Sequence, residues 1–398
     1  MRILINDFAG HPFQVQLSRA LAARGNEVLH CYCSSNLSPK GSLQKRADDA
    51  AGFSVQAIQI GTPFEKYGLL KRWSQERAIG HAIVEKARAF KPDIIVSANT
   101  PLGTQGVLLR FSRARHIPFV YWVQDMLSFG IDAQLRLRLP VIGAGVGLAF
   151  QKYERLLLAR SSHIVSITKD FLDYFPKQLK RIKNVTVIEN WAPLDELPVL
   201  MQDNTWSAKH GLGDKLCILY SGTLGLKHNP DLLVRLATQF AARNDVQVVV
   251  ISEGMGADYL AKKKSELGLQ NLTLLPFQAF DEMPQVLASA EVLVAILEKE
   301  AGVFAVPSKV LTYLCAERAL LLAIPYDNLA ARIVREHGAG LTAAPDDADA
   351  FVQVAERLIG DKNLRLQMAR KGRAYAENTF DIQRIVSQFE EVFAMASH

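Results

Sequence analysis

The sequence predicts an α/β protein built from two doubly wound, Rossmann-like domains that face one another across a cleft. Short apolar runs alternate with helical patterns along the first half of the chain, and the same alternation restarts after a proline-rich segment near residue 193. The 398 residues are also too many for one ordinary hydrophobic core. Alternating strands and helices form parallel sheets with crossover helices. We therefore expect domains at 1–192 and 193–398.

The first half contains seven apolar runs that are bounded by turn residues and have the length of strands. Helical patterns separate them, as in Phe13–Arg24, where Val15, Leu17 and Leu21 recur at helical spacing and Gly25 is suited to end the helix. The predicted strands are Arg2–Asn6, Glu27–Cys33, Val55–Ile60, Asp93–Ser97, Phe119–Val123, His163–Ile167 and Val185–Glu189.

The second half repeats the pattern after the linker Asn190–Pro198. At the end of the chain, Asp381–Met395 places Ile385, Phe389 and Phe393 on one helical face, which predicts an amphipathic helix that packs on the protein and bridges the two domains. The predicted strands of this half are Leu216–Ser221, Val246–Ser252, Leu272–Leu275, Val292–Leu297 and Leu320–Ile324.

Two loops of the second half have the composition of phosphate-binding sites. Gly222 and Gly225 follow an apolar strand and permit close approach of the backbone to an anion, and Lys227 adds a positive charge before the next helix. Further along, Ser308 is a candidate N-cap and Lys309 falls in the first helical turn. Two anion sites in one domain indicate a diphosphate, and hence a nucleotide-linked substrate.

Charge is divided unevenly between the halves. Residues 1–192 hold 26 Lys and Arg against 14 Asp and Glu, and residues 193–398 hold 20 against 26, so the halves carry net charges of +12 and −6. A basic half attracts anionic surfaces such as phospholipid. The stretch Leu135–Leu139 interleaves arginine with leucine, which suits either an interfacial segment on anionic lipid or a helix that packs on the sheet.

Other features favour a cytoplasmic protein that is peripheral on the inner face of the cytoplasmic membrane. The N-terminus lacks the pattern of a signal peptide, and the charge-free run Leu139–Gln151 is 13 residues long, well short of the ~20 that span a bilayer. The four cysteines and nine histidines show no metal-ligand spacing. We expect no metal and no cofactor apart from the substrate itself.

The order and spacing of five motifs resemble those of the GT-B glycosyltransferases of family 4, and most closely the WbuB-like branch associated with bacterial O-antigen and capsule assembly. The likeness runs along essentially the whole chain. It implies that the C-terminal half binds a nucleoside diphosphate sugar, which we expect to be UDP-linked, and that the sugar is transferred with retention. The motifs are Ala22-Ala-Arg-Gly-Asn-Glu-Val28, Val187-Ile-Glu-Asn-Trp191, Tyr220-Ser-Gly-Thr-Leu-Gly225, Val306-Pro-Ser-Lys309 and Ala339-Gly-Leu341.

The chain departs from the family at the donor site. Thr223 stands near the place of a family arginine, so Lys227 and Lys309 are the remaining cations for the diphosphate. The family also has two glutamates with seven residues between them. Aligned on Glu300 the second place falls on Ser308, whereas aligned on the helix the pair becomes Phe304 and Thr312. The predicted donor residues are Gly222, Thr223, Lys227, Glu253, Glu300, Gly302, Ser308, Lys309 and Thr312.

The resemblance implies that the N-terminal half binds the acceptor. A sugar linked to polyprenyl pyrophosphate is one candidate for this acceptor. The family commonly has a histidine after the fifth strand of this half; here that place is Gln124, followed by Asp125, and these two are the catalytic candidates. Gln124 suits orientation of a hydroxyl, and Asp125 suits gripping the acceptor or acting as a base. Gly10, His11 and Asn99 lie in loops after strands and are predicted to contact the acceptor.

Several alternatives remain open at this point. Gly143-Ala-Gly-Val-Gly147 imitates a dinucleotide loop but follows no strand, so we interpret it as a flexible loop. Asp347 and Asp349 imitate a metal-binding pair but open a surface helix, where acidic residues are expected. A nucleotide-sugar epimerase of the same architecture and a bilobed binding protein without chemistry are the rival functions. No recognition motif supports nucleic-acid binding.

Overall fold

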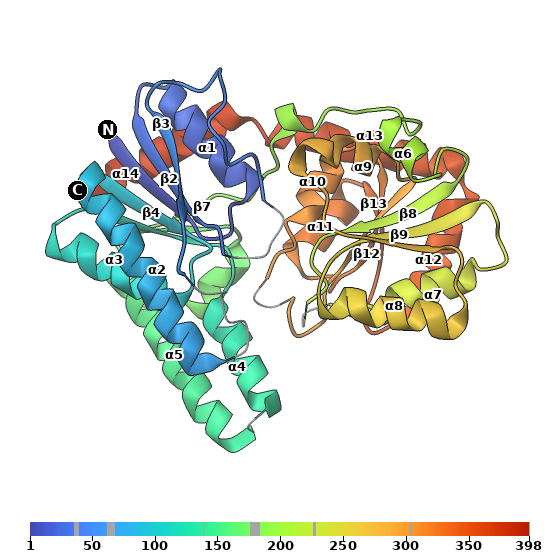
Figure 1. The fold of residues 1–398 in the computed structure, drawn as a ribbon, viewed down its shortest axis with the longest axis horizontal. Coiled ribbons are helices and arrows are strands. Elements are labelled where there is room, and N and C mark those ends of the chain that lie inside the picture. The colour runs from blue at the N-terminus through green and yellow to red at the C-terminus, as the bar shows by residue number, and fades with distance from the viewer. Residues whose placement is uncertain are drawn as a thin grey trace. The chain divides into compact units, whose positions relative to one another are not determined.

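The computed structural model describes residues 1–35, 40–61, 68–138, 140–175, 184–225, 228–302 and 305–397. Contacts divide the chain into unit 1, which comprises Met1–Asn190 and Ile382–His398, and unit 2, which comprises Trp191–Asp381. The terminal segment is grouped with unit 1 although it follows unit 2 in the chain. Figure 1 shows a parallel sheet with covering helices in each unit.

Unit 1 contains a seven-stranded sheet in the order β3-β2-β1-β4-β5-β6-β7, and all its pairings are parallel. The order reverses between β1 and β4, which makes the fold doubly wound and places a topological switch point at the carboxyl ends of these two strands. The strands are β1 Arg2–Asp7, β2 Glu27–Cys33, β3 Phe53–Ile58, β4 Ile94–Ala98, β5 Phe119–Val123, β6 His163–Ser166 and β7 Val185–Val187.

The helices of unit 1 follow the predicted alternation. In α1, proline occupies the first turn, where its missing N–H costs nothing, and Gly25 adopts a φ of 86° just beyond the end. Two long helices, α4 and α5, lie side by side and project from the sheet (Figure 1). The described helices are α1 Pro12–Ala23, α2 Leu69–Phe90, α3 Leu102–Ala114, α4 Leu127–Arg138, α5 Pro140–Arg160, the 3-10 turn Lys169–Tyr174 and α14 Ile382–Ser397.

Unit 2 repeats the plan with six parallel strands in the order β10-β9-β8-β11-β12-β13, so its switch point lies between β8 and β11. The strands are β8 Leu216–Ser221, β9 Val246–Ile251, β10 Leu272–Leu275, β11 Val292–Ile296, β12 Ala319–Ala323 and β13 Gly340–Ala343. The helices are α6 Thr205–Lys209, α7 Asp231–Gln239, α8 Met255–Leu267, α9 Met283–Ala288, α10 Lys309–Cys315, α11 Leu329–Glu336, α12 Ala348–Gly360 and α13 Lys362–Thr379, with 3-10 turns at Leu194–Glu196 and Phe280–Glu282.

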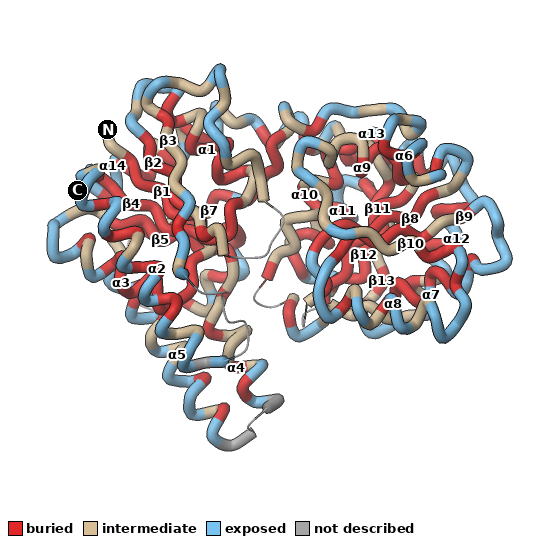
Figure 2. Tube along the Cα trace, viewed as in Figure 1, coloured by how far each residue is buried: buried red, intermediate tan, exposed pale blue. Residues whose placement is uncertain are grey.

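The central strands β4, β5, β11 and β12 are buried along their whole length, and Figure 2 shows the buried colour in the interior of each unit. Sheets covered on both faces need apolar residues at every strand position, which is why these strands read as continuous apolar runs rather than alternating ones. Because most strand positions are apolar, polar side chains concentrate near the strand ends and in the loops that follow them.

The terminal helix is confirmed as amphipathic. Ile385, Val386, Phe389 and Phe393 are buried, and Phe389 packs edge-on against Trp122 of β5 with ring centroids 4.7 Å apart. On the opposite side, Arg24 donates hydrogen bonds to Gln383, Ser387 and Glu390. The helix α14 is therefore an integral part of unit 1.

The prediction of a flexible loop at Gly143–Gly147 is wrong, because these residues lie within helix α5. A Cβ on Gly143 would lie 2.3 Å from the Leu135 carbonyl oxygen, and one on Gly147 would lie 1.9 Å from Asp132 Oδ1. The glycines, four residues apart on one helical face, thus allow α5 to approach α4 closely. Their purpose is helix packing.

Strand β13 is an element that the sequence did not predict. It pairs with β12 and is short, and its first residue, Gly340, lies where a Cβ would be 2.2 Å from the Leu320 carbonyl oxygen. Glycine is unfavourable in a strand unless another backbone comes this close. The expectation for Asp347 and Asp349 is confirmed: Asp347 caps α12 by accepting a hydrogen bond from the Ala350 amide, and Asp349 lies in its first turn.

Candidate functional site

At the switch point of unit 2, Lys309 from the start of α10 lies against the loop that follows β8. Its Nζ is 3.6 Å from the centroid of the Tyr220 ring, which is a cation–π geometry. A Cβ on Gly222 would lie 2.8 Å from the same Nζ, and Gly222 has a φ of 133°, which side-chain-bearing residues rarely adopt. A side chain at position 222 would therefore be strained and would displace the ammonium group of Lys309.

Two tyrosines fix this loop. Tyr313, one turn along α10 from Lys309, accepts a hydrogen bond from the Ser221 amide and donates one to the Ser221 carbonyl, both at 3.0 Å. Tyr220 donates to the carbonyl of Thr223 at 2.9 Å. Burial raises the pKa of both phenols above the ordinary range, so both remain neutral donors. The loop and helix α10 are thus held as one rigid unit around the lysine.

Other predicted donor residues surround this centre less closely. Ser308 is the N-cap of α10 as expected, but its side chain makes no capping hydrogen bond, and Thr312 is half-buried on the same helix. The exposed Glu253 accepts a hydrogen bond from the Phe277 amide at 3.0 Å, which ties the loops after β9 and β10 together. Lys227 and Phe304 lie outside the described residues.

The loop after β11 carries Glu300 and Gly302. Desolvation raises the pKa of Glu298, and the neighbouring charges of Glu300, which is exposed, and Asp346 raise it further. Gly302 packs against Pro325, where a Cβ would lie 2.6 Å from the proline Cγ. Gly302 is therefore required by packing, whatever it contacts in a substrate.

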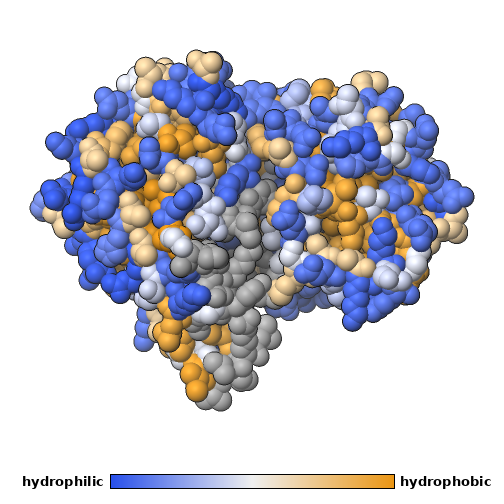
Figure 3. Space-filling model, in the orientation of Figure 1, coloured by the Kyte–Doolittle hydropathy of each residue, from blue (hydrophilic) through white to orange (hydrophobic). Residues whose placement is uncertain are grey.

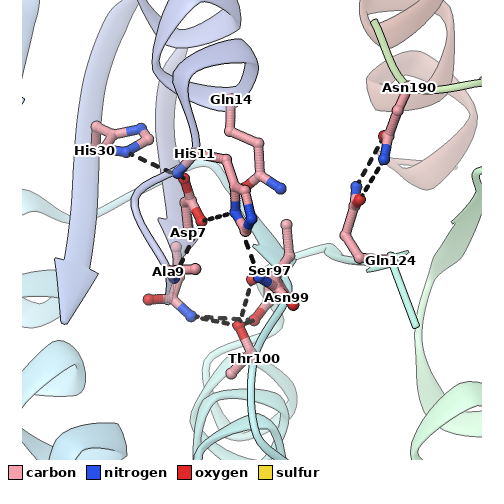
Figure 4. Close-up of polar contacts among 12 residues, drawn as sticks. Asp7, Ala9, His11, Gln14, His30, Ser97, Asn99, Thr100, Gln124 and Asn190 are labelled. Carbon is pink, nitrogen blue, oxygen red and sulfur yellow. Dashed lines mark hydrogen bonds and ion pairs between the residues drawn. The ribbon is translucent and has the colours of Figure 1, made fainter. Parts of the chain in front are cut away.

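At the switch point of unit 1, the loops after β1 and β4 bring His11 and Asn99 together. Asn99 Nδ2 lies 3.3 Å from His11 Nδ1, and Asp7 Oδ1 lies 3.5 Å from the same ring nitrogen (Figure 4). Gly10 and Asn99 both have positive φ, 78° and 49°, so each loop turns sharply as it leaves its strand. Three predicted acceptor residues are thus adjacent.

The buried carboxylate of Asp7 is a functional candidate that the sequence interpretation missed. Its oxygens accept hydrogen bonds from the backbone amides of Ala9 and His11, and its side chain is fully buried. The signal was present in the sequence, because Asp7 ends an apolar strand and lies four residues before His11.

Behind Asp7 lies a second histidine. His30 Nε2 is 3.9 Å from Asp7 Oδ2, and its Nδ1 is 2.8 Å from Ser18 Oγ. Burial lowers the pKa of His30 to about 4, against an opposing effect from Asp7 and with a further lowering by Arg19. His30 is therefore neutral at physiological pH and contributes no positive charge beside Asp7.

Asn99 is positioned by a polar cluster beneath it. Asn6 Nδ2 donates to Thr100 Oγ1 at 2.7 Å, and Ser97 Oγ donates to Gln105 Oε1 and lies 3.0 Å from Thr100 Oγ1 (Figure 4 shows part of this cluster). These side chains are buried. Because hydrogen-bonded groups in a low-dielectric interior hold fixed orientations, the loop after β4 is rigid where Asn99 emerges.

The two catalytic candidates after β5 differ in their surroundings. Gln124 is 8% exposed and exchanges two amide hydrogen bonds with Asn190, at 3.1 and 2.6 Å. Both polar atoms of its side chain are thus engaged, at the point where unit 1 ends. Asp125 is half-buried beside it. The structure places Gln124 with Asn190 and not in the cluster of His11, Asp7 and Asn99 (Figure 4).

Comparison with known proteins identifies both parts of the chain. The model of the "Glycosyl transferase 4-like domain" matches residues 11–191, and that of "Glycosyl transferases group 1" matches residues 202–375. A curated relative, the putative colanic acid biosynthesis glycosyl transferase WcaI of Escherichia coli K12, is 23% identical over 310 residues, which cover 76% of this chain and 74% of WcaI.

Solved structures resemble the fold along its whole length. Anabaena HepE in complex with UDP and glucose superposes with a TM-score of 0.71 at 16% identity, covering 99% of each chain. The sucrose-phosphate synthase of Thermosynechococcus elongatus gives 0.74 at 13% identity, covering 99% of this chain and 98% of that one. WaaG, a glycosyltransferase of lipopolysaccharide biosynthesis, gives 0.67 at 14% identity, covering 99% of each chain.

Proposed function

The chain belongs to the GT-B glycosyltransferases of family 4, and from this premise we propose that it moves a sugar from a UDP-linked donor to a lipid-linked or saccharide acceptor, with retention at the anomeric carbon, in the assembly of a bacterial surface polysaccharide. The name of the relative WcaI, a putative colanic acid biosynthesis glycosyl transferase, supports a role in polysaccharide assembly. The complexes of HepE with UDP and glucose and with UDP-glucose support UDP as the nucleotide of the donor.

The observation that carries the donor half of the proposal is the position of Lys309. Its ammonium group lies beside Gly222, where the absence of a side chain lets an anion approach the backbone. A diphosphate at this point would gain a charge-assisted hydrogen bond, and the same charge would stabilise the diphosphate as it departs. Gly222, Thr223, Lys227 and Ser308 are the further candidates for phosphate contacts, and Glu253, Glu300, Gly302 and Thr312 for the sugar and ribose.

The acceptor half of the proposal uses unit 1. Gly10, His11 and Asn99 lie in the loops at its switch point, which is where ligands of doubly wound sheets bind. Asp125 remains a candidate for gripping the acceptor. Gln124 acts through its amide pair with Asn190, which fixes the end of β5 against the residue at which the chain leaves unit 1 for unit 2.

A transfer assay with and without acceptor tests the proposal. Purified protein with a UDP-sugar and a polyprenyl-pyrophosphate sugar should release UDP and form a larger glycoconjugate, whose anomeric configuration reports retention. An epimerase would convert the donor without any acceptor. Conversion of the donor to its epimer in the absence of acceptor, with no glycoside formed, would replace the proposed function by that rival.

We further propose that the hairpin of α4 and α5 attaches the protein to anionic lipid. No helix in the described part of the chain combines the length and apolar composition that crossing a bilayer needs. The hairpin nevertheless exposes Ile142, at 69%, and Leu148, at 47% (Figure 3 shows apolar side chains on this projection). The exposed charged residues of α5 are all cations, Lys152, Arg155 and Arg160, whereas Glu154 is buried. Apolar and cationic side chains together suit an interfacial segment.

Glutamate at both Ile142 and Leu148 should weaken binding to vesicles of anionic phospholipid at least tenfold. The change removes apolar contacts of about 1.5–3 kcal/mol each and adds repulsion from the lipid charge. Flotation of the two proteins with vesicles measures it, and Leu366→Glu, at an exposed leucine of unit 2, is the control. Equal flotation of the double variant and the parent would contradict this attachment.

A further inference from the structure

Helix α4 begins directly after the loop that carries Gln124 and Asp125, and the residue before it is a poor cap. That residue is Met126, whose thioether is only a weak hydrogen-bond acceptor. Helix α3, which follows the loop of Asn99, is preceded by Pro101, which makes no side-chain capping hydrogen bond. The backbone amides at the starts of both helices therefore need acceptors from elsewhere in the fold.

Glu154 of α5 supplies the acceptors for α4. Its Oε1 accepts a hydrogen bond from the Leu127 amide at 3.2 Å, and its Oε2 accepts two from Ser128, one from the amide at 3.1 Å and one from Oγ at 2.5 Å. Glu154 is 1% exposed, so these hydrogen bonds lie in a medium of low polarity, where they hold fixed orientations. Its negative charge also complements the positive end of the helix dipole.

The same carboxylate contacts the strand that precedes the loop. The hydroxyl group of Tyr121 in β5 lies 3.5 Å from Glu154 Oε1. Because Tyr121 comes before the loop and Leu127 follows it, one side chain holds both ends of the segment that carries Gln124 and Asp125. These contacts all come from donors, so the ionised carboxylate is the form that fits them. They oppose the effect of burial, which raises the pKa of Glu154.

A second buried glutamate holds helix α3 in the same manner. Glu76 of α2 is 6% exposed, and its Oε2 accepts a hydrogen bond from the Gly103 amide, in the first turn of α3, at 3.1 Å. The Glu76 carbonyl accepts another from Thr104 Oγ1 at 2.6 Å. A Cβ on Gly103 would lie 2.9 Å from Glu76 Oε2, so the glycine admits the carboxylate. Glutamates from neighbouring helices thus cap the helices that follow two candidate acceptor loops.

A capping residue on the helix itself would satisfy the same amides with less loss of hydration. An N-terminal serine or aspartate stays partly solvated, whereas desolvation of a buried carboxylate opposes folding. The cross-helix glutamate adds orientation, because it fixes the start of α4 relative to both β5 and α5. Side chains that bind a substrate need this kind of support from residues behind them.

We propose that Glu154 is a positioning residue for acceptor binding, because it fixes both ends of the loop that carries Gln124 and Asp125. Glu76 acts in the same way on the loop that carries Asn99. The inference rests on the proposed glycosyl transfer, in which these loops contact the acceptor. Since Glu154 is buried, it acts through the loop and not on the substrate itself.

The test compares Glu154→Gln with the parent in steady-state transfer assays. Glutamine keeps the shape of glutamate, but its NH2 group must face donors where one carboxylate oxygen was, so the loop is held less firmly. The kcat/KM for the acceptor should fall about 10- to 100-fold, mostly through KM, while the KM for the donor and the affinity for UDP stay within about twofold. Glu76→Gln should act in the same sense. The control is Glu85→Gln, at an exposed glutamate of α2, which should leave all these constants unchanged.

The split between the kinetic constants separates positioning from a loss of folded protein. If Glu154 only stabilised the fold, Glu154→Gln would lower the melting temperature and the apparent kcat with both KM values unchanged, and this result would overturn the inference. Should Glu154→Gln fail to fold, Ser128→Ala decides, because it removes one hydrogen bond and keeps the carboxylate. Its acceptor KM should rise several-fold, and an unchanged value would contradict the positioning role.

The outcomes also separate this inference from the function on which it rests. If the parent protein makes no glycoside with any donor and acceptor, the glycosyl transfer is wrong and the inference falls with it. If the parent is active and a folded Glu154→Gln protein keeps the parent's acceptor KM, the transfer stands and only the role of Glu154 is wrong.

Discussion

Alanine at Lys309 should weaken the binding of UDP roughly 10- to 150-fold. A hydrogen bond between a charged group and phosphate contributes about 1.5–3 kcal/mol, and each 1.4 kcal/mol is a factor of ten in the dissociation constant. The loss should extend to kcat, because the same ammonium group faces the charge that develops on the departing diphosphate. Calorimetric titration of UDP measures the first effect, and initial rates at saturating donor measure the second.

Lys262→Ala is the control for this change, because Lys262 lies on α8 with its side chain 74% exposed and 3.7 Å from Glu266. Removing it should leave UDP binding unchanged. Removing Lys309 also deletes the cation–π contact with Tyr220, so the melting temperature of the variant must be recorded. If a folded Lys309→Ala protein binds UDP with the parent's affinity, the donor site does not lie at this position.

Alanine at Gly222 should lower both the stability of unit 2 and its affinity for UDP. The φ of 133° is a conformation that residues with a Cβ rarely adopt, and the strain is about 1–3 kcal/mol. The new methyl group would lie 2.8 Å from Lys309 Nζ and 3.0 Å from its Cε, so the lysine must move away from the loop. The expected affinity is therefore as low as that of Lys309→Ala.

Combining the two substitutions checks that they act through the same contact. If Gly222→Ala works by displacing Lys309, the double variant should bind UDP no more weakly than either single variant, because neighbouring sites that share one interaction are not additive. Gly360→Ala, where a Cβ would meet no atom within 4 Å, controls for the loss of a glycine in unit 2. Full additivity of the two effects would contradict the displacement.

The sequence predicted the fold well because its signals are strong for buried parallel sheets. Strands such as Ile94–Ala98 and Ala319–Ala323 are uninterrupted apolar runs, and such runs have few other stable arrangements. Periodicity failed where glycine had a packing role. Gly143 and Gly147 suggest a loop in the sequence, although in the structure they allow two helices to pack closely. Gly340 similarly made strand β13 unrecognisable, because the close approach of another backbone depends on a partner that is distant in sequence.

The candidate site was predicted less completely than the fold. The sequence identified Lys309, Gly222, His11 and Asn99, since residue type and position after a strand suffice to select them. It could not show that Lys309 lies against Gly222, about ninety residues earlier, because that contact depends on β8 and β11 being neighbours in the sheet. The role of Asp7 was hidden for a related reason, because burial and hydrogen bonding, and not residue type, distinguish it from an ordinary acid at a strand end.

The central claim is that unit 2 binds the diphosphate of the donor between Gly222 and Lys309. A crystal structure of the protein with UDP tests it most directly. We predict a phosphate oxygen within hydrogen-bonding distance of Lys309 Nζ, with the diphosphate passing over the Cα of Gly222. UDP bound with its diphosphate away from both residues, while the two remain as described here, would contradict the account.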